Sequence, residues 1–410
     1  CITLVMMNLL YRILINLIAS VLPSIGIFNK RVKRFLEFRK DTFNKISSSI
    51  NSGDNHIWVH AASLGEYELA VPFIIKLKKK FKNKIILIFF SESGFKLKKR
   101  ISEIDYTFYL PLDTKSNSQK FIKIINPCIS VFVKSEIWPN YIDELNHHGS
   151  KKYLIEANFK KKDWYFIFFN SLIKNKIKTF DKIFVQDQNS KNILNENEIN
   201  NVEIVGSLKI ERVKLQLNLN NKIDKFEELS KNKKIIVCGS TWKEDEEIII
   251  EYIKKNNHED LFWIIAPHNT SNDNLKRIKH NFSVPVSYFS DEKIQSNILL
   301  VDTIGDLKKL YSYCKIAYIG GGMGNTGLHN ILEACVFDIP VVIGKNYKKF
   351  IESVDLVSMG GVISIRNQIE FNNQFDKLIS DGNYRQKLTK IISKYLKIRT
   401  GASERIIKSI

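Results

Sequence analysis

The chain has few cysteines and contains no pair of aspartates separated by a single residue. Its 5 cysteines stand at positions 1, 128, 238, 314 and 335 of 410. They lack the spacing of a metal site, and several lie within apolar segments, which is typical of buried, reduced thiols in a cytoplasmic protein. An Asp-x-Asp pair often bridges a divalent cation to a diphosphate, so its absence favours chemistry without a metal or other cofactor.

The N-terminus lacks an uninterrupted apolar run, although it is strongly apolar from Met6 to Phe28. A spanning helix needs about 20 apolar residues, whereas Arg12, Pro23 and other residues interrupt this run. No small-residue cleavage pattern follows it, which argues against a signal peptide. Residues 1–40, which end in a basic cluster, are therefore expected to anchor the protein at an anionic membrane surface. A spanning helix and a helix packed on the protein's own core are the alternatives.

Acidic residues are outnumbered, with 43 Asp and Glu against 63 Lys and Arg, for a formal net charge of +20. Such a balance raises nucleic acid as a partner. The lysines, however, are spread through a sequence rich in Asn and Ile, which is typical of AT-biased coding and favours a solvated surface. We expect a membrane surface or a phosphate as the partner of these cations and no nucleic acid, because basic residues follow the apolar N-terminus.

Beyond residue 55, short apolar segments alternate with helical stretches such as Tyr67–Lys80. The expected strands form two series: 56–60, 84–90, 129–133, 152–155, 182–185 and 203–205, then 233–238, 261–265, 298–301, 315–319 and 339–343. Such alternation predicts parallel sheets covered on both faces, with ligands at the carboxyl ends of the strands. We expect an α/β protein of two Rossmann-like, doubly wound domains, at 41–213 and 233–410, joined by a polar linker at 214–232. The last helices, 374–407, are expected to pack back across the domain interface.

Five glycines crowd into eight residues between Gly320 and Gly327, directly after an apolar strand. Glycine lets a backbone bend and approach a ligand closely. A helix is expected to begin near His329, with its free amides and positive dipole end toward the loop. Glu333 would share a face of that helix with His329, where a carboxylate suits ribose hydroxyls. The segment therefore predicts a nucleotide pocket.

Other strand ends carry polar residues that are weak candidates individually. Glu66 opens a helix after the turn containing Ser63 and Gly65; it either complements the helix dipole or acts as a general base. Thr241 and Glu244 are expected to form a helix capping box, although Thr241 and its neighbours also suit a phosphate or a sugar acid. Further candidates at strand ends are Glu136, Lys209 and Ser240.

Together these loops resemble the family of 3-deoxy-D-manno-octulosonic acid (Kdo) transferases, in a Bacteroidetes-like branch of glycosyltransferase family 30. The family's motifs occur in order as H-A-x-S-x-G-E at 60–66, L-P-L-D at 110–113, E-x-W-P-N at 136–140, G-x-L-K at 206–209, G-S-T at 239–241 and a glycine run with H-N-x-L-E at 320–333. The resemblance covers nearly the whole chain. Two departures stand out: Ala266-Pro267-His268 occurs where many members carry P-R-H, and Lys134 replaces a common acidic residue.

The resemblance implies a GT-B glycosyltransferase with an N-terminal anchor at the cytoplasmic face of the inner membrane. The implied donor is CMP-Kdo and the implied acceptor is the tetra-acylated lipid A precursor. Transfer would be inverting and metal-independent, with Glu66 as the general base. The implied donor-binding residues are Lys209, Ser240, Thr241, Pro267, His268, Gly320, Gly321, Gly322, Asn330 and Glu333. Acceptor-side or structural roles are implied for Ser63, Gly65 and Glu136.

Three other functions are compatible with parts of the sequence. Another GT-B envelope transferase would use a UDP-sugar in place of CMP-Kdo. A nicotinamide dehydrogenase would show G-x-G-x-x-G after its first strand, whereas the first strand here runs into Ala-Ser-Leu-Gly-Glu. A basic adaptor without enzymatic activity would bind nucleic acid or membrane in a strongly salt-dependent manner.

Overall fold

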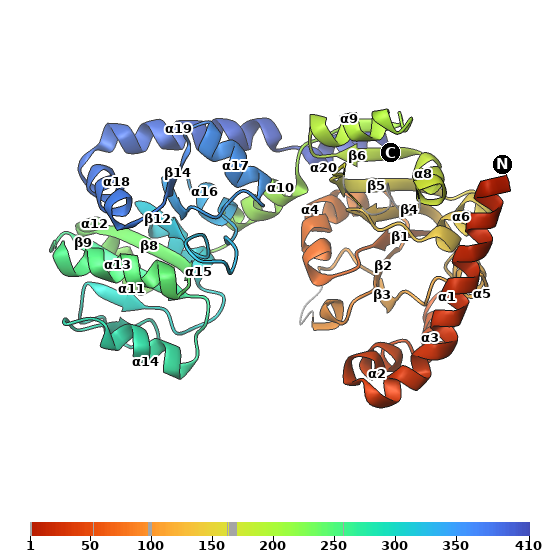
Figure 1. Cartoon of the computed structure of the whole chain (residues 1–410), viewed down its shortest axis with the longest axis horizontal. Helices are drawn as coiled ribbons and strands as arrows, with labels where there is room; N and C mark the ends of the chain where they lie inside the picture. The colour runs from red at the N-terminus through yellow and green to blue at the C-terminus, as the bar shows by residue number, and fades with distance from the viewer. Residues whose placement is uncertain (1, 52, 97–100, 162, 164–169, 257) are drawn as a thin grey trace. The chain divides into compact units, whose positions relative to one another are not determined.

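The computed structural model describes the whole chain except residues 1, 52, 97–100, 162, 164–169 and 257 (Figure 1). The described chain forms two compact units, one of residues 1–212 with 399–410 and one of residues 213–398. The segment 214–232, expected as a linker, thus lies within the second unit. Its Phe226 is fully buried against neighbouring aromatic rings, so an apolar contact draws this otherwise polar segment into that unit.

The first unit contains a seven-stranded sheet in the order β3-β2-β1-β4-β5-β6-β7, and its described strands pair in parallel. The strands are β1 (His56–His60), β2 (Ile85–Phe89), β3 (Tyr106–Tyr109), β4 (Pro127–Val133), β5 (Lys151–Ala157), β6 (Lys182–Val185) and β7 (Val202–Ile204). The helices are α1 (Ile2–Phe28), α2 (Lys30–Glu37), α3 (Thr42–Ser49), α4 (Leu64–Lys80), η1 (Glu92–Lys96), α5 (Lys115–Ile125), α6 (Pro139–His148), α8 (Asn170–Lys178), α9 (Gln188–Glu196), α10 (Leu208–Lys214) and α20 (Ala402–Ser409). Every residue of β1 and β2 is buried, as expected when helices cover both faces of a parallel sheet.

The second unit repeats this architecture, with parallel strands in the order β10-β11-β9-β8-β12-β13-β14. The strands are β8 (Lys234–Thr241), β9 (Leu261–Pro267), β10 (Ser287–Tyr288), β11 (Ile298–Leu300), β12 (Ile316–Ile319), β13 (Val341–Gly344) and β14 (Val362–Ile365). The helices are η2 (Leu215–Asn218), α11 (Asp224–Glu227), α12 (Leu229–Asn232), α13 (Lys243–Lys255), α14 (Asn272–His280), α15 (Leu307–Leu310), η3 (Tyr311–Tyr313), α16 (Leu332–Cys335), α17 (Ile351–Ser358), α18 (Gln368–Ser380) and α19 (Gly382–Arg399). The carboxyl ends of β9, β8 and β12 are adjacent, so the loops that follow them meet at one edge.

The predicted α/β fold with doubly wound parallel sheets is confirmed, and each predicted strand overlaps an observed one. The strands β3, β10 and β14 were not predicted. Each lies at an outer position of its sheet, where a strand has one neighbour and incomplete cover. Such strands need fewer apolar residues, which weakens the sequence signal.

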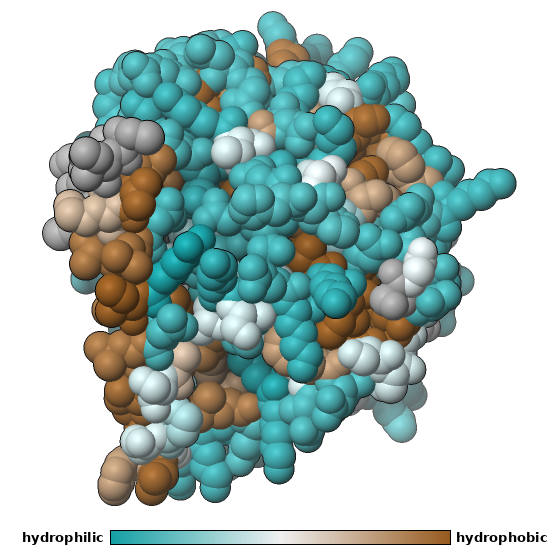
Figure 2. All heavy atoms as spheres, turned by 90° about the vertical axis from the view of Figure 1, so that its right-hand side faces the viewer, coloured by the Kyte–Doolittle hydropathy of each residue, from teal (hydrophilic) through white to brown (hydrophobic). Residues whose placement is uncertain are grey.

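Helix α1 occupies most of the predicted anchoring segment and attaches to the first unit along one side. The hydroxyl of Tyr11 donates to Asp113 at 2.7 Å, and Arg12 Nε donates to Asn140 at 3.1 Å. Its other side exposes apolar side chains: Val5, Met6, Leu9, Leu10, Ile13, Leu14, Leu17, Ile18, Val21, Ile25, Ile27 and Phe28. They form an apolar column along the left edge of Figure 2. By length and composition α1 is apolar enough to cross a membrane, and its outward-facing apolar side chains are not part of the protein's core.

Candidate active site

Glu66 lies in the first turn of α4, directly after the end of β1. Ser63 caps this helix: its Oγ accepts from the amide of Glu66 at 3.4 Å, and the Glu66 carboxylate accepts from the amide of Ser63 at 3.2 Å. Burial, followed by the charge of Glu136, raises the pKa of Glu66, while Lys134 and His60 oppose the shift. A carboxyl group with a raised pKa is suited to accept a proton near neutral pH. Capping fixes its orientation, so the two roles considered for Glu66 are compatible.

Glu136 reaches the same edge because β1 and β4 are neighbouring strands. Its Oε2 lies 3.7 Å from Nε2 of His60, and Trp138 Nε1 donates to the same nitrogen at 3.2 Å. A neutral His60 therefore carries its proton on Nδ1, which is buried without a partner among the described residues. His60 and Lys134 were not selected as site residues from the sequence. Their positions at the carboxyl ends of β1 and β4 were the sequence signal that could have identified them.

Lys209 lies in the first turn of α10, after β7, and a buried carboxylate holds the start of this helix in place. Glu156, at the end of β5, accepts from the amide of Leu208 at 2.6 Å and from Ser207 Oγ at 2.8 Å. Gln186 donates a third hydrogen bond at 2.9 Å, and burial raises the pKa of Glu156 to about 7. Its φ of 53° is unusual for a residue other than glycine. Sequence reasoning missed Glu156 because nothing within the strand pattern sets it apart.

The second unit gathers several predicted donor residues at the carboxyl edge of β8, β9 and β12. Ser240 and Thr241 end β8, and Pro267 ends β9. His268 follows, and its ring stacks on Trp242 with centroids 4.6 Å apart. Three neighbouring strands thereby bring polar groups and flat rings from distant parts of the sequence together.

His329 completes this ring cluster, although it was expected only as the start of a helix. Its ring lies 4.7 Å from that of His268, and its Nε2 accepts from Trp242 Nε1 at 3.3 Å. Burial and the nearby His268 lower the pKa of His329. The cluster of Trp242, His268 and His329 can stack on a flat ring or donate hydrogen bonds to an anion.

The glycine run is braced by a side chain of the protein itself. Asp245 accepts from the amide of Gly321 at 2.7 Å, from that of Met323 at 3.4 Å and from the hydroxyl of Tyr318 at 2.7 Å. Two backbone amides of the glycine run are therefore already engaged within the protein. Gly321 has a φ of 87°, and a Cβ there would lie 2.1 Å from the carbonyl oxygen of Gly327. These glycines permit close packing of backbone on backbone.

The same packing applies to the remaining glycines predicted to bind the donor. A Cβ on Gly320 would lie 2.4 Å from the carbonyl oxygen of Ser240, and one on Gly322 would lie 2.9 Å from the amide of Gly344. Both glycines therefore join the loop to neighbouring strand ends. Gly65 in the first unit differs, because a Cβ there would meet nothing within 4 Å.

The helix expected near His329 begins later, at Leu332, and is a single turn, α16. The amide of His329 instead donates to the carbonyl oxygen of Gly320 at 3.1 Å, and its ring is held by Trp242 and His268. Asn330 Oδ1 accepts from the amide of Leu332 at 3.3 Å, and Glu333 lies 3.3 Å from Lys308. The expectation of a helix that begins near His329, with His329 and Glu333 on one face, was wrong. A single turn supplies little dipole to a phosphate.

The capping box expected between Thr241 and Glu244 does not form. Thr241 is the last residue of β8, and its hydroxyl donates to Glu246 Oε1 at 3.1 Å. Asp245 accepts from the amide of Trp242 at 2.9 Å and so caps α13 one residue later. The buried carboxylate of Glu246 also pairs with Arg277 of α14. Glu246 therefore links Arg277 to Thr241. Arg277 supplies a cation near a site that has no arginine beside Pro267.

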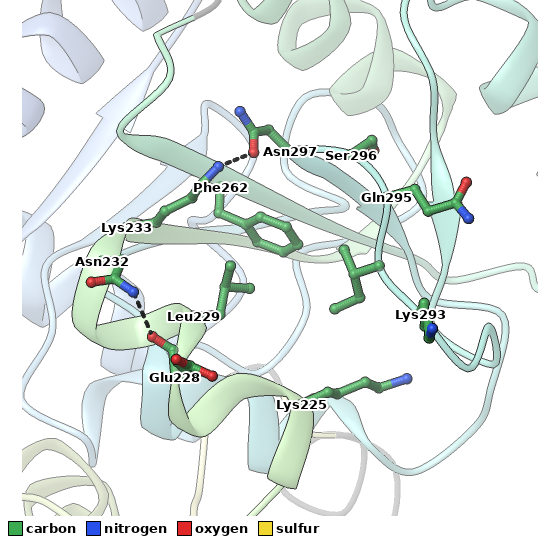
Figure 3. A pocket seen from close by; sticks show the side chains of 11 residues that line it. Lys225, Glu228, Leu229, Asn232, Lys233, Phe262, Lys293, Gln295, Ser296 and Asn297 are labelled. Carbon is green, nitrogen blue, oxygen red and sulfur yellow. Dashed lines mark hydrogen bonds between the residues drawn. The ribbon is translucent and has the colours of Figure 1, made fainter.

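A separate hollow of about 620 Å³ lies in the second unit (Figure 3). Leu229 and Phe262 point into it, and Lys233 bonds to Asn297 at its rim. It adjoins the amino ends of β8, β9 and β11, at the opposite edge of the sheet from Thr241 and His268. It is therefore not part of the candidate active site. No group of three or more His, Cys, Asp or Glu side chains suited to a metal occurs in the described part of the chain.

Comparison with known proteins finds similarity over most of the chain. Residues 30–212 match the model of a family described as 3-deoxy-D-manno-octulosonic-acid transferase. A 3-deoxy-D-manno-octulosonic acid transferase of Rickettsia felis is 27% identical over 91% of this chain and 84% of its own. One of Aquifex aeolicus is 28% identical over 81% of this chain and 88% of its own. The predicted Bacteroidetes-like branch stays a prediction.

Among solved structures, the chain is similar to the UDP-GlcNAc 2-epimerase of Neisseria meningitidis bound to UDP-GlcNAc. That match has a TM-score of 0.64 at 17% identity and covers 86% of this chain and 98% of the epimerase. A trehalose-6-phosphate protein of E. coli bound with UDP-2-fluoro glucose matches with a TM-score of 0.53 at 9% identity, over 87% and 98% of the two chains. At these identities the likeness concerns the fold alone, and it agrees with the predicted GT-B class.

Proposed function

We propose that this chain, which is similar to 3-deoxy-D-manno-octulosonic acid transferases, transfers Kdo from CMP-Kdo to the tetra-acylated lipid A precursor. Transfer is inverting and metal-independent, with Glu66 as the general base. The observation that carries the proposal is the setting of Glu66. Its carboxylate is fixed at the start of α4 beside Glu136, and burial raises its pKa.

The proposed chemistry is a single displacement at the anomeric carbon of Kdo. The acceptor hydroxyl oxygen forms a bond to that carbon on the face opposite CMP, and its proton passes to Glu66. The bond between the anomeric carbon and the phosphate oxygen breaks, and CMP leaves with the electron pair. A base of raised pKa suits this step because it accepts the proton without requiring a strongly alkaline site.

The neighbourhood of Glu66 supports an acceptor site. Gly65 presents no side chain, and a Cβ there would meet nothing within 4 Å. Packing within the chain therefore does not require a glycine at this position. A bare backbone beside the base leaves room for the acceptor sugar. Glu136 is assigned the second role of keeping the pKa of Glu66 raised through its charge.

The donor half is assigned to the carboxyl edge of the second unit. The rings of Trp242, His268 and His329 are suited to hold the cytosine base or the donor's anionic groups. Glu333 is assigned to the ribose hydroxyls, which would replace its contact with Lys308. Lys308 would then be free to meet the phosphate. The glycine run shapes this pocket through its packing, and Asp245 keeps it rigid.

The membrane attachment is assigned to α1. Its exposed apolar column suits the inner-membrane surface on the cytoplasmic side, where the acyl chains of the acceptor lie. Basic residues in α2 are placed to attract anionic headgroups. The acceptor and the enzyme would therefore meet on one surface.

Replacement of the base tests the proposal directly. In purified enzyme with CMP-Kdo and lipid acceptor, Glu66→Gln is expected to lower kcat by roughly 10²–10⁴-fold. Glu68→Gln, two residues along the same helix and with a half-exposed side chain, serves as the matched control and should retain activity. The acidic limb of the wild-type pH–rate profile should lie at higher pH than that of an exposed carboxyl group, because the base must be ionised and its pKa is raised. Near-normal transfer by Glu66→Gln would falsify the role of Glu66.

A donor panel separates the proposal from its nearest alternative, a GT-B transferase that uses a UDP-sugar. The wild-type enzyme should form product from CMP-Kdo and none from UDP-glucose or UDP-GlcNAc. Product from a UDP-sugar alone would favour the alternative. Mass spectrometry of the lipid product would also count the Kdo units transferred.

A further inference from the structure

A polar hollow of about 410 Å³ lies beside α1 in the first unit, away from Glu66. Its walls come from three helices: Arg12 from α1, Lys115 from α5, and Asp143, Glu144 and His147 from α6. The hollow therefore combines cations and carboxylates within one small space. This mixture of charges distinguishes it from a basic patch, which would attract any anion.

Part of this lining is already neutralised within the protein. Arg12 contacts Asn140 at 3.1 Å and Asp143 at 3.5 Å, and Asp143 also pairs with Lys176. These contacts hold α1 against α6 and use only some of the N–H donors of the guanidinium.

The rest of the lining has no such pairing. Lys115, Glu144 and His147 have no ion-pair partner among the described residues. A cation and a carboxylate thus line the same hollow without compensating each other through a direct contact.

The hollow adjoins a helix that is suited to a lipid surface. Figure 2 shows the apolar column of α1 at the left edge of the face, and Arg12 lies within that helix. If α1 lies in the membrane interface, a hollow beside Arg12 lies at the depth of lipid headgroups. The two observations, a helix with an exposed apolar side and a hollow of mixed charge, are independent.

We infer that this hollow binds the zwitterionic headgroup of an aminophospholipid, with the phosphate near Arg12 and Lys115 and the primary ammonium near Glu144. The inference rests on the membrane attachment proposed for α1. The carboxylate disfavours a headgroup that carries only negative charge. A primary ammonium donates hydrogen bonds to a carboxylate, which the quaternary ammonium of phosphatidylcholine cannot do.

Vesicle flotation of the full-length protein tests the inference. Phosphatidylcholine vesicles with and without phosphatidylethanolamine are compared at equal lipid concentration. The wild-type protein should bind the ethanolamine vesicles roughly threefold to tenfold more tightly. Glu144→Gln and Lys115→Gln should each abolish this preference while keeping the binding to pure phosphatidylcholine that α1 provides. Soluble phosphoethanolamine should compete for the preference and leave the basal binding unchanged.

Lys123→Gln provides the matched control, because Lys123 is exposed on α5 and does not line the hollow. It should behave as wild type. A preference that survives in Glu144→Gln arises from bilayer packing and would overturn the inference, as would equal binding to both vesicles. Absence of binding to either vesicle would instead overturn the proposed role of α1, so the two failures are distinguishable.

Discussion

Two buried carboxylates, Glu156 and Asp113, organise the loops of the first unit, and burial raises the pKa of each to about 7. Asp113 accepts from the amides of Asn140 at 3.2 Å and Tyr141 at 3.0 Å, so it joins two matched motifs, L-P-L-D and E-x-W-P-N. The aspartate of the first motif thus serves structure by holding the start of α6. Glu156 does the same for the start of α10, which carries Lys209.

Replacing Glu156 should change how stability depends on pH. Its pKa is about 7 in the folded protein against the ordinary 4.5, so between these values the folded state holds a proton that the unfolded state has released. The free energy of unfolding therefore falls as the pH rises through this range. In Glu156→Gln this contribution is absent, and the fall between pH 5 and pH 8 should be smaller by roughly 1–3 kcal/mol.

Thermal or urea unfolding across this pH range measures the effect. The glutamine remains compatible with the loop, because the Ser207 hydroxyl and the Gln186 amide can both reverse their hydrogen-bonding roles. Glu196→Gln, at an exposed position, is the control and should keep the wild-type pH dependence. An unchanged slope in Glu156→Gln would show that this carboxyl group titrates normally.

The glycine loop and α16 illustrate how an element acquires its shape from its neighbours. The loop packs against the end of β13, since Gly322 lies against Gly344, and Asp245 of α13 binds its amides. These contacts hold the chain in an irregular path as far as Leu332, so the helix that follows is short. Local propensity in this segment favours an earlier helix, but tertiary contacts prevail.

Gly321→Ala should disrupt the loop and weaken donor binding. Its Cβ would overlap the carbonyl oxygen of Gly327, and its φ of 87° disfavours alanine. We expect at least about a tenfold loss of affinity for CMP by calorimetry. Gly305→Ala is the matched control, because Gly305 also has a positive φ, 105°, but nothing lies within 4 Å of its Cβ. The Gly305→Ala variant introduces backbone strain without a steric clash. Equal affinities of the two variants for CMP would contradict the proposed role of the loop.

The chain as a whole crosses from the first unit to the second and returns. Its last described segment, 399–410, packs on the first unit through α20, which contacts α4. Ser403 binds the buried carboxylate of Glu211, and Lys80 of α4 donates to the carbonyl oxygen of Ile407 at 2.7 Å. Because α4 carries Glu66, this returning helix supports the element that holds the proposed base.

Shortening the chain after Thr400 should therefore loosen the first unit selectively. Hydrogen exchange measured by mass spectrometry is expected to show at least about tenfold faster exchange in α4, with β8 in the second unit unchanged. Ser409→Ala, which removes only a contact to Glu203 at 3.1 Å, should leave both regions as in wild type. Equal protection of α4 in the shortened and full chains would rule out this support.

The sequence by itself determined the two parallel α/β sheets, the apolar N-terminal helix and the placement of Glu66 after β1. These follow from short-range patterns: apolar runs that must be buried on both faces, and a serine and glutamate spaced to cap a helix. Through the family motifs, it also identified the segments at the strand ends that carry the candidate site residues.

Tertiary structure alone decided which polar groups meet. It brought Trp242, His268 and His329 into one cluster and placed Asp245 against the amides of the glycine run. It also placed Glu156 at the start of α10 and packed α20 against α4. The physical reason is that the partners are far apart in sequence, and contacts of this kind depend on strand order and packing, which local patterns do not encode.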